Sequence, residues 1–151
     1  MLRDAVNNGL KEAMKAKDAR RVSTLRLINA GIKNADIAAR GEGKGALADE
    51  DLLGLLQKMI KQRQESAELY DKGGRGELAA QEREEIAIIQ GFLPQQLAEA
   101  EARAAIAAVV AETGAAGMKD MGRVMAALKE RYAGRMDFAQ ASGVVKGLLA
   151  G

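Results

Sequence analysis

The chain has 151 residues and a net charge of +2, and it contains neither cysteine nor histidine. This composition excludes disulfides, thiolate nucleophiles, histidine general bases and zinc sites made of Cys and His. The charges are unevenly distributed, because residues 1–40 carry nine Lys or Arg against four Asp or Glu, whereas residues 77–101 carry one Arg against six Glu.

Residues that favour β-strands are scarce. One proline, 3% aromatic residues and abundant Ala, Leu, Glu, Lys and Arg predict an all-α protein. The first residues have no apolar stretch typical of a secretory signal, and no later window is long and apolar enough for a membrane span. We therefore expect a cytoplasmic protein with no membrane partner.

The first two helices are predicted from apolar residues at helical spacing. One runs from Leu2 to about Lys17, and Asp18 is placed to cap the next. In the second helix Arg26, Lys33 and Arg40 recur every seven residues, about 10 Å apart. Such a row can follow a phosphate backbone, but a solvent-exposed flank is the more common explanation. Residues 41–46 form a glycine-rich linker that lacks the spacing of a phosphate-binding loop.

Two further helices precede the only proline. Residues 49–72 have one apolar stripe, and glycines at positions 73, 74 and 76 end it. In residues 77–92 the carboxylates of Glu82, Glu84 and Glu85 suggest either a metal or general-acid site or a solvated helix face. The solvated face is favoured, because no His or Asp cluster completes a site.

Pro94 disfavours helical geometry in the residue before it and predicts a boundary between two units. We expect an N-terminal unit of about four helices over residues 1–93 and a C-terminal three-helix bundle over residues 94–151. Within the second unit, an Ala-rich helix ends near Gly114, and two short helices follow as a hairpin. Asp120 and Asp137 are the predicted caps of these two helices, and the apolar stripe of the last one includes Leu148.

The outer surface of this hairpin is basic. It carries six cations against three acids, a local net charge of +3, and the cations are Lys119, Arg123, Lys129, Arg131, Arg135 and Lys146. A surface of this charge attracts a polyanion, but a solvated face explains the charges equally well. Four of the seven methionines also lie in or beside the hairpin, where they either fill the core or form a docking groove.

Several separated motifs occur in an order that resembles the YqeY family along essentially the whole chain. They are KQRQES from Lys61, YDKGGR from Tyr70, residues 82–89, FLPQQL from Phe92, and DMGRVM from Asp120 followed by Gly134 and Arg135. The second unit also resembles the tail of the GatB subunit of the tRNA-dependent amidotransferase. The sequence departs from the commoner pattern after Arg135 and at Ala98, where a capping Ser is usual.

The resemblance implies an all-helical protein of two units whose C-terminal unit engages tRNA. It associates the chain with carbon-nitrogen ligation that uses glutamine as nitrogen donor, but only the tail is represented, and neither a catalytic site nor a cofactor is implied. The positions that match the family's hairpin pattern are Lys119, Gly122, Arg123 and Arg135, with Lys129 and Lys146 as further basic candidates. Gly122 would allow close approach of a backbone or a phosphate.

Three functions are therefore open. The first is a non-catalytic tRNA-binding module that acts through the basic hairpin. The second is a protein-interaction module that docks through the Met-rich hairpin or the first unit, with an amidotransferase or another translation factor as partner. The third is an enzyme, which without His or Cys would need a Lys or Glu of shifted pKa.

Overall fold

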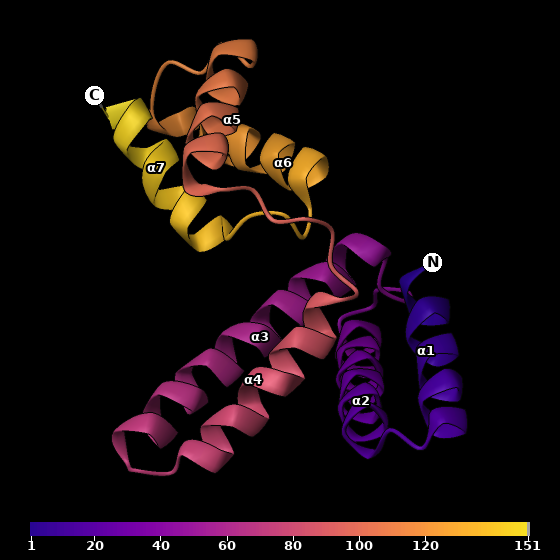
Figure 1. Ribbon diagram of the computed structural model, residues 1–151. Helices are drawn as coiled ribbons and strands as arrows, with labels where there is room; N and C mark the ends of the chain where they lie inside the picture. The colour runs from indigo at the N-terminus through magenta and orange to yellow at the C-terminus, as the bar shows by residue number, and fades with distance from the viewer. Residues whose placement is uncertain (151) are drawn as a thin grey trace. The chain divides into compact units, whose positions relative to one another are not determined.

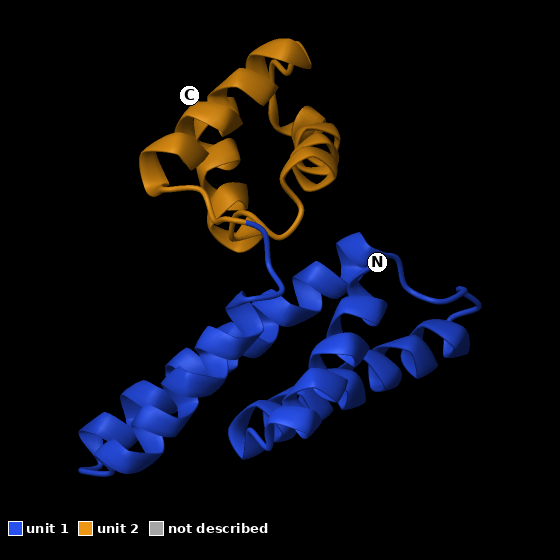
Figure 2. Cartoon of the chain, turned by 45° about the vertical axis from the view of Figure 1, so that its right-hand side comes forward, with its two compact units in different colours: residues 1–94 blue, residues 95–151 orange. Residues whose placement is uncertain are grey.

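The computed structural model describes residues 1–150 and confirms the all-α class. In that range the chain forms seven α-helices and one short 3-10 helix, with no strand. The chain divides into two compact units, Met1–Pro94 and Gln95–Gly151 (Figure 2). None of the helices described for residues 1–150 has the length and apolar character needed to span a membrane.

The first unit contains four helices. They are α1 (Leu2–Ala16), α2 (Ala19–Gly41), α3 (Asp49–Lys72) and α4 (Gly76–Gln90). Helices α3 and α4 lie side by side as a long hairpin, and α1 packs along α2 (Figure 1). The core between them is aliphatic and includes Val6, Leu25, Ile28, Leu56 and Ile89. The predicted cap of α2 is confirmed, because the Asp18 carboxylate accepts a hydrogen bond from the Arg21 N–H at 3.1 Å.

An ionic clamp fixes the end of the glycine-rich linker against α1 and α2. Both terminal nitrogens of Arg3 donate to the Asp36 carboxylate, at 2.6 and 2.8 Å, and one of them also donates to the Leu47 carbonyl at 2.9 Å. The Leu47 N–H in turn donates to Asp36 at 3.1 Å. Because Arg3 and the Leu47 N–H stabilise its charged form, the pKa of Asp36 falls from 3.8 to about 2.

The prediction that the glutamates of α4 form a solvated face is wrong at Glu85. This side chain is 9% exposed and pairs with Arg63 of α3, whose Nε lies 3.1 Å from its carboxylate. Burial, together with the negative charge of Glu85, raises the pKa of the neighbouring Glu82. Glu85 therefore joins the two helices of the hairpin, whereas Glu84 stays exposed and pairs with Arg20.

The second unit is a three-helix bundle made of α5 (Glu99–Glu112), α6 (Met121–Tyr132) and α7 (Phe138–Ala150), with the 3-10 helix η1 (Met118–Asp120) just before α6. Its core contains buried residues from all three helices and from the α6–α7 turn, including Ile106, Val124, Leu128, Met136 and Val145. Small Ala and Val side chains fill the spaces around them, which lets the helices approach closely.

Two local predictions for this unit are wrong and one is confirmed. Asp137 does cap α7, because its carboxylate accepts from the Ala139 and Gln140 N–H groups at 2.9 and 3.3 Å. Asp120 does not cap α6 in this way, since η1 precedes the helix and the carboxylate accepts instead from the Ala116 N–H at 2.9 Å. Leu148 lies outside the core stripe and is 47% exposed.

Candidate nucleic-acid interface

The predicted site residues lie on three helical elements of the second unit and on one turn between them. Lys119 is in η1, Gly122, Arg123 and Lys129 are in α6, Arg135 is in the α6–α7 turn, and Lys146 is in α7. All are exposed except Arg135, which is partly buried. The set therefore surrounds the helical hairpin, and its largest group lies along η1 and α6.

Helix α6 has one buried face and one solvent-exposed face. Val124 and Leu128 are fully buried. At 100° per residue, Gly122 lies on the outward side, with Arg123 and Lys129 at its two edges. Apart from its chain neighbours and the backbone of its own helix, a Cβ at Gly122 would meet no atom of the described chain within 4 Å. Nothing in the described part of the unit therefore requires a glycine here, and the backbone of α6 is open to an approaching molecule at Gly122.

The charges along η1 and α6 are only partly neutralised. Arg123 pairs with Asp120 one turn earlier, at 3.0 Å, and its side chain remains 56% exposed. Hydrogen bonds from the Ala116 and Gly117 N–H groups and the charges of Arg123 and Lys119 outweigh burial and lower the pKa of Asp120. No carboxylate of residues 1–150 lies within 4.0 Å of the ammonium groups of Lys119, Lys129 and Lys146. These three cations are available to an external anion.

Arg135 has a structural contact that sequence reasoning missed. Its Nε donates to the Gln95 carbonyl at 3.0 Å, and its own carbonyl accepts from the Leu97 N–H at 2.9 Å. Beside it, the Gln96 side chain donates to the Gly134 carbonyl. Since these partners are about forty residues apart in the chain, no local sequence pattern indicated them. Arg135 thus holds the α6–α7 turn against residues 95–97 while part of its guanidinium faces solvent.

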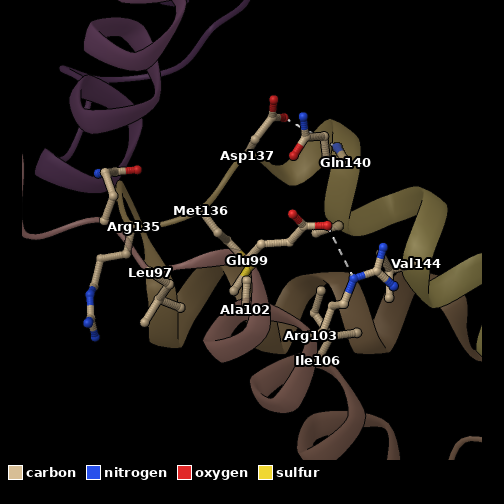
Figure 3. Close-up of a pocket in the computed structure, with 12 residues that line it drawn as sticks. Leu97, Glu99, Ala102, Arg103, Ile106, Arg135, Met136, Asp137, Gln140 and Val144 are labelled. Atoms are coloured by element: carbon tan, nitrogen blue, oxygen red, sulfur yellow. Dashed lines mark hydrogen bonds and ion pairs between the residues drawn. The ribbon is translucent and has the colours of Figure 1, made fainter.

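A groove of about 450 Å³ lies beside this turn, between α5 and the start of α7 (Figure 3). Its rim carries both signs of charge, because Glu99 pairs with Arg103 at 3.6 Å and Asp137 caps α7. In the close-up the Arg135 guanidinium at the left is separated from that of Arg103 at the right. The groove is therefore no concentrated anion site, and the cations of η1 and α6 do not line it.

Arg131 is less available to an external anion than its charge alone would suggest. It forms an ion pair with Glu112 of α5, which ties the end of α6 to the end of α5. The hydrogen bond that Arg131 donates to the Glu112 carboxylate is also the main reason why the pKa of Arg131 is raised. Among residues 1–150, no group of three or more Asp, Glu, Cys or His residues is arranged to hold a metal ion.

A family of Yqey-like proteins matches residues 3–149, nearly the whole chain. The chain belongs to the YqeY family. Similar curated proteins are named "altered inheritance of mitochondria protein 41, mitochondrial". The protein from Lachancea thermotolerans is 42% identical over 86 residues, which cover 57% of this chain and 44% of that protein. Those from Vanderwaltozyma polyspora and Eremothecium gossypii are 40% and 36% identical over 56% of this chain and 44% of each relative.

The chain thus spans less than half the length of the curated YqeY relatives that it matches. Their names also contradict the prediction of a cytoplasmic location, because they describe mitochondrial proteins. That prediction rested on the lack of cysteine and of an apolar stretch in the first residues. Neither feature distinguishes one reducing compartment from another, so neither supports a cytoplasmic over a mitochondrial location.

Proposed function

We propose that the chain is a non-catalytic module that binds structured RNA, and tRNA in particular, through the basic surface of its C-terminal hairpin. We call this the hairpin surface, and its residues are Lys119, Gly122, Arg123, Lys129, Arg135 and Lys146. The observation that carries the proposal is the combination of unpaired, exposed lysines with the open backbone at Gly122. Exposed cations and an accessible helix backbone can contact the sugar-phosphate backbone of RNA.

The aromatic residues support structured RNA over single strands. Proteins that bind single strands stack bases on exposed aromatic rings. Here Tyr132 and Phe138 pack against the core of the second unit, and Phe92 packs in the first unit below the Arg21 guanidinium. A helical or folded RNA, recognised through its backbone and shape, requires no such rings.

The resemblance of the second unit to the GatB tail suggests the class of RNA and the partner. In that setting the tail engages a tRNA while a separate catalytic body amidates the aminoacyl end. By analogy, the chain would hold a tRNA for a glutamine-dependent carbon-nitrogen ligase without performing the reaction itself. This association is part of the proposal and rests on the resemblance alone.

No observation favours docking through a Met-rich groove. Met136 is 4% exposed and belongs to the core, and Met121 and Met125 pack against it. Only Met118 of the four is largely exposed, at 44%. Packing thus explains the methionines of the hairpin, and its solvent-exposed surface is characterised mainly by the cations.

A footprint on the full chain tests the proposal. In an NMR titration with bulk tRNA, we expect the amide signals of Lys119, Gly122, Arg123 and Lys129 to shift or broaden first. The amides of α3 serve as the internal control, because that helix carries no residue of the hairpin surface. Equal broadening over both units, or perturbation only in the first unit, would contradict the proposed site.

A further inference from the structure

An open cavity with both apolar and cationic side chains lies at the turn between α1 and α2. It has a volume of about 670 Å³, and its main lining residues are Met14, Lys17, Val22, Ser23, Arg26 and Leu27. Met14 and Leu27 are 52% and 45% exposed, although both are large apolar residues. Neither packs in the core of the first unit, so this apolar surface has no partner within that core.

The charges at this cavity have one sign. Lys17 lies in the turn that follows α1, Arg26 lies on α2, and no carboxylate lines the cavity. The nearest acid in the sequence, Asp18, is engaged in capping α2. Over residues 11–26 there are six Lys or Arg against two Asp or Glu. An occupant must therefore offer apolar groups to the cavity and negative charge to its edge.

Lys17 has a backbone conformation that its residue type does not favour. Its φ of 58° and ψ of 33° are left-handed, and among residues 1–150 it is the only non-glycine residue with a positive φ. The residue ends α1, because its N–H donates to the Met14 carbonyl at 3.2 Å. Glycine is the usual residue at such a helix end, since it avoids the steric cost of a Cβ. A lysine here is explained if its ammonium group is needed at the cavity.

We propose that this cavity binds an acidic peptide segment of a partner protein, which inserts a large apolar side chain between Met14, Val22 and Leu27. Its carboxylates pair with Lys17 and Arg26. Apolar anchors that fill a concave site are typical of protein recognition. A nucleic acid would leave the exposed Met14 and Leu27 without a complementary group. This site is in the first unit and is independent of the RNA proposed for the hairpin surface.

The cavity also differs from the row of cations along α2. Arg26 lines the cavity, but Lys33 and Arg40 do not, although all three are exposed on the same helix. Ile37 offers a second comparison, since it is 55% exposed on α2 and lies outside the cavity. An acidic peptide in the cavity uses Arg26 and Leu27, whereas an anion that follows the row uses Arg26 and Lys33.

The test is a selection of peptides followed by matched variants. A phage-displayed library of random 16-residue peptides is selected on the full chain after depletion on the Leu27→Asp variant. We expect enriched peptides to carry several Asp or Glu around a large apolar or aromatic residue. A synthetic peptide of the enriched sequence should bind at least about tenfold more weakly to Leu27→Asp and Arg26→Glu, and with unchanged affinity to Ile37→Asp and Lys33→Glu.

Lys17→Gly separates a binding role from a structural one. The variant should unfold at a higher temperature, because glycine relieves the left-handed strain, and yet bind the peptide several-fold more weakly. No enrichment of acidic peptides, or equal loss of affinity in the cavity variants and their controls, would overturn the proposal. So would a finding that tRNA or anionic vesicles, but no peptide, bind through Arg26 and Lys33.

Discussion

At the scale of single residues, Gly122 is the position at which stability and binding are expected to diverge. A methyl group there meets no other segment of the described chain within 4 Å. Replacing a glycine inside an exposed helix by alanine stabilises the helix by roughly 0.5–1 kcal/mol. Gly122→Ala should therefore raise the free energy of unfolding by about that amount, but weaken tRNA binding several-fold, because the methyl group blocks approach of the RNA backbone.

Gly54 of α3 is the matched control for this variant. Gly54 is also exposed inside a helix, and a Cβ added there would have no neighbour from another segment within 4 Å. It differs from Gly122 because it lies in the first unit. Gly54→Ala should stabilise the protein to a similar extent and leave tRNA affinity unchanged. Urea denaturation and a binding titration on both variants check the pair. Unchanged tRNA affinity in Gly122→Ala would show that no partner approaches this backbone.

Asp36 makes the stability of the first unit dependent on pH. Its pKa is about 2 in the folded protein, against an ordinary value of 3.8. The folded state therefore binds fewer protons, and the stability from the Arg3 clamp is fully present above about pH 4 and is lost as the pH falls towards 2. Urea denaturation at several pH values should show this loss in the wild type and much less of it in Asp36→Asn. Glu65→Gln, at an exposed carboxylate of α3, should keep the wild-type pH profile.

The caps show how far single residues could be predicted. Asp18 and Asp137 each accept hydrogen bonds from N–H groups two or three residues later, so the signal is local and the sequence contains it. Asp120 has the same chemistry, but the preceding 3-10 helix directs its carboxylate backwards to the Ala116 N–H. The contacts of Arg3 with Asp36 and of Arg135 with Gln95 span 33 and 40 residues, so no local pattern could predict them.

At the scale of elements, the least exposed ion pair between the helices of the α3–α4 hairpin stabilises their packing. The Arg63 and Glu85 side chains are 15% and 9% exposed, so removing one partner leaves the other charge poorly solvated. Glu85→Ala should lower the free energy of unfolding by about 3 kcal/mol. Glu84→Ala, which breaks an exposed pair with Arg20, should cost less than about 1 kcal/mol.

A double variant tests whether the charge or the shape of this contact matters. Arg63→Met with Glu85→Leu removes both charges and keeps apolar volume, so it should recover most of the stability lost in Glu85→Ala. Chemical denaturation of the three variants measures the difference. If the double variant were as unstable as Glu85→Ala, the loss would come from packing and not from an unpaired charge.

The burial of Glu85 cannot be predicted from the sequence of α4 alone. On α4 the apolar residues alone predict the buried face, and a glutamate among Arg83, Glu82 and Glu84 resembles a solvated position. Its burial depends on Arg63, which lies in another helix and 22 residues earlier. Helix bounds were more predictable, since apolar spacing and glycines are local signals. The exposed position of Leu148 shows that the edge of such a stripe is not fixed by spacing alone.

At the scale of the whole molecule, charge is segregated along the chain, and the two proposed sites use different parts of it. The hairpin surface is in the second unit, and the cavity at the α1–α2 turn is in the first. The all-α class could be predicted from the composition, and the basic hairpin could be predicted from helical spacing and the positions of the charged residues. The sequence could not predict that Arg131 and Arg135 already have partners within the unit, since those contacts join residues far apart in the sequence.

The decisive measurement is a titration of the full chain with bulk tRNA at about 50 and 200 mM salt. Arg123→Glu with Lys129→Glu is compared with Lys58→Glu and Lys61→Glu, an exposed pair on α3 with the same change in net charge. The affinity of the wild type for tRNA should fall as the salt concentration rises. The hairpin variant should bind at least about tenfold more weakly, and the slope of its log affinity against log salt concentration should be smaller by roughly two. The α3 variant should resemble the wild type in both quantities. Equal affinity loss in both variants, or no tRNA binding at the lower salt concentration, would contradict RNA binding through the hairpin surface.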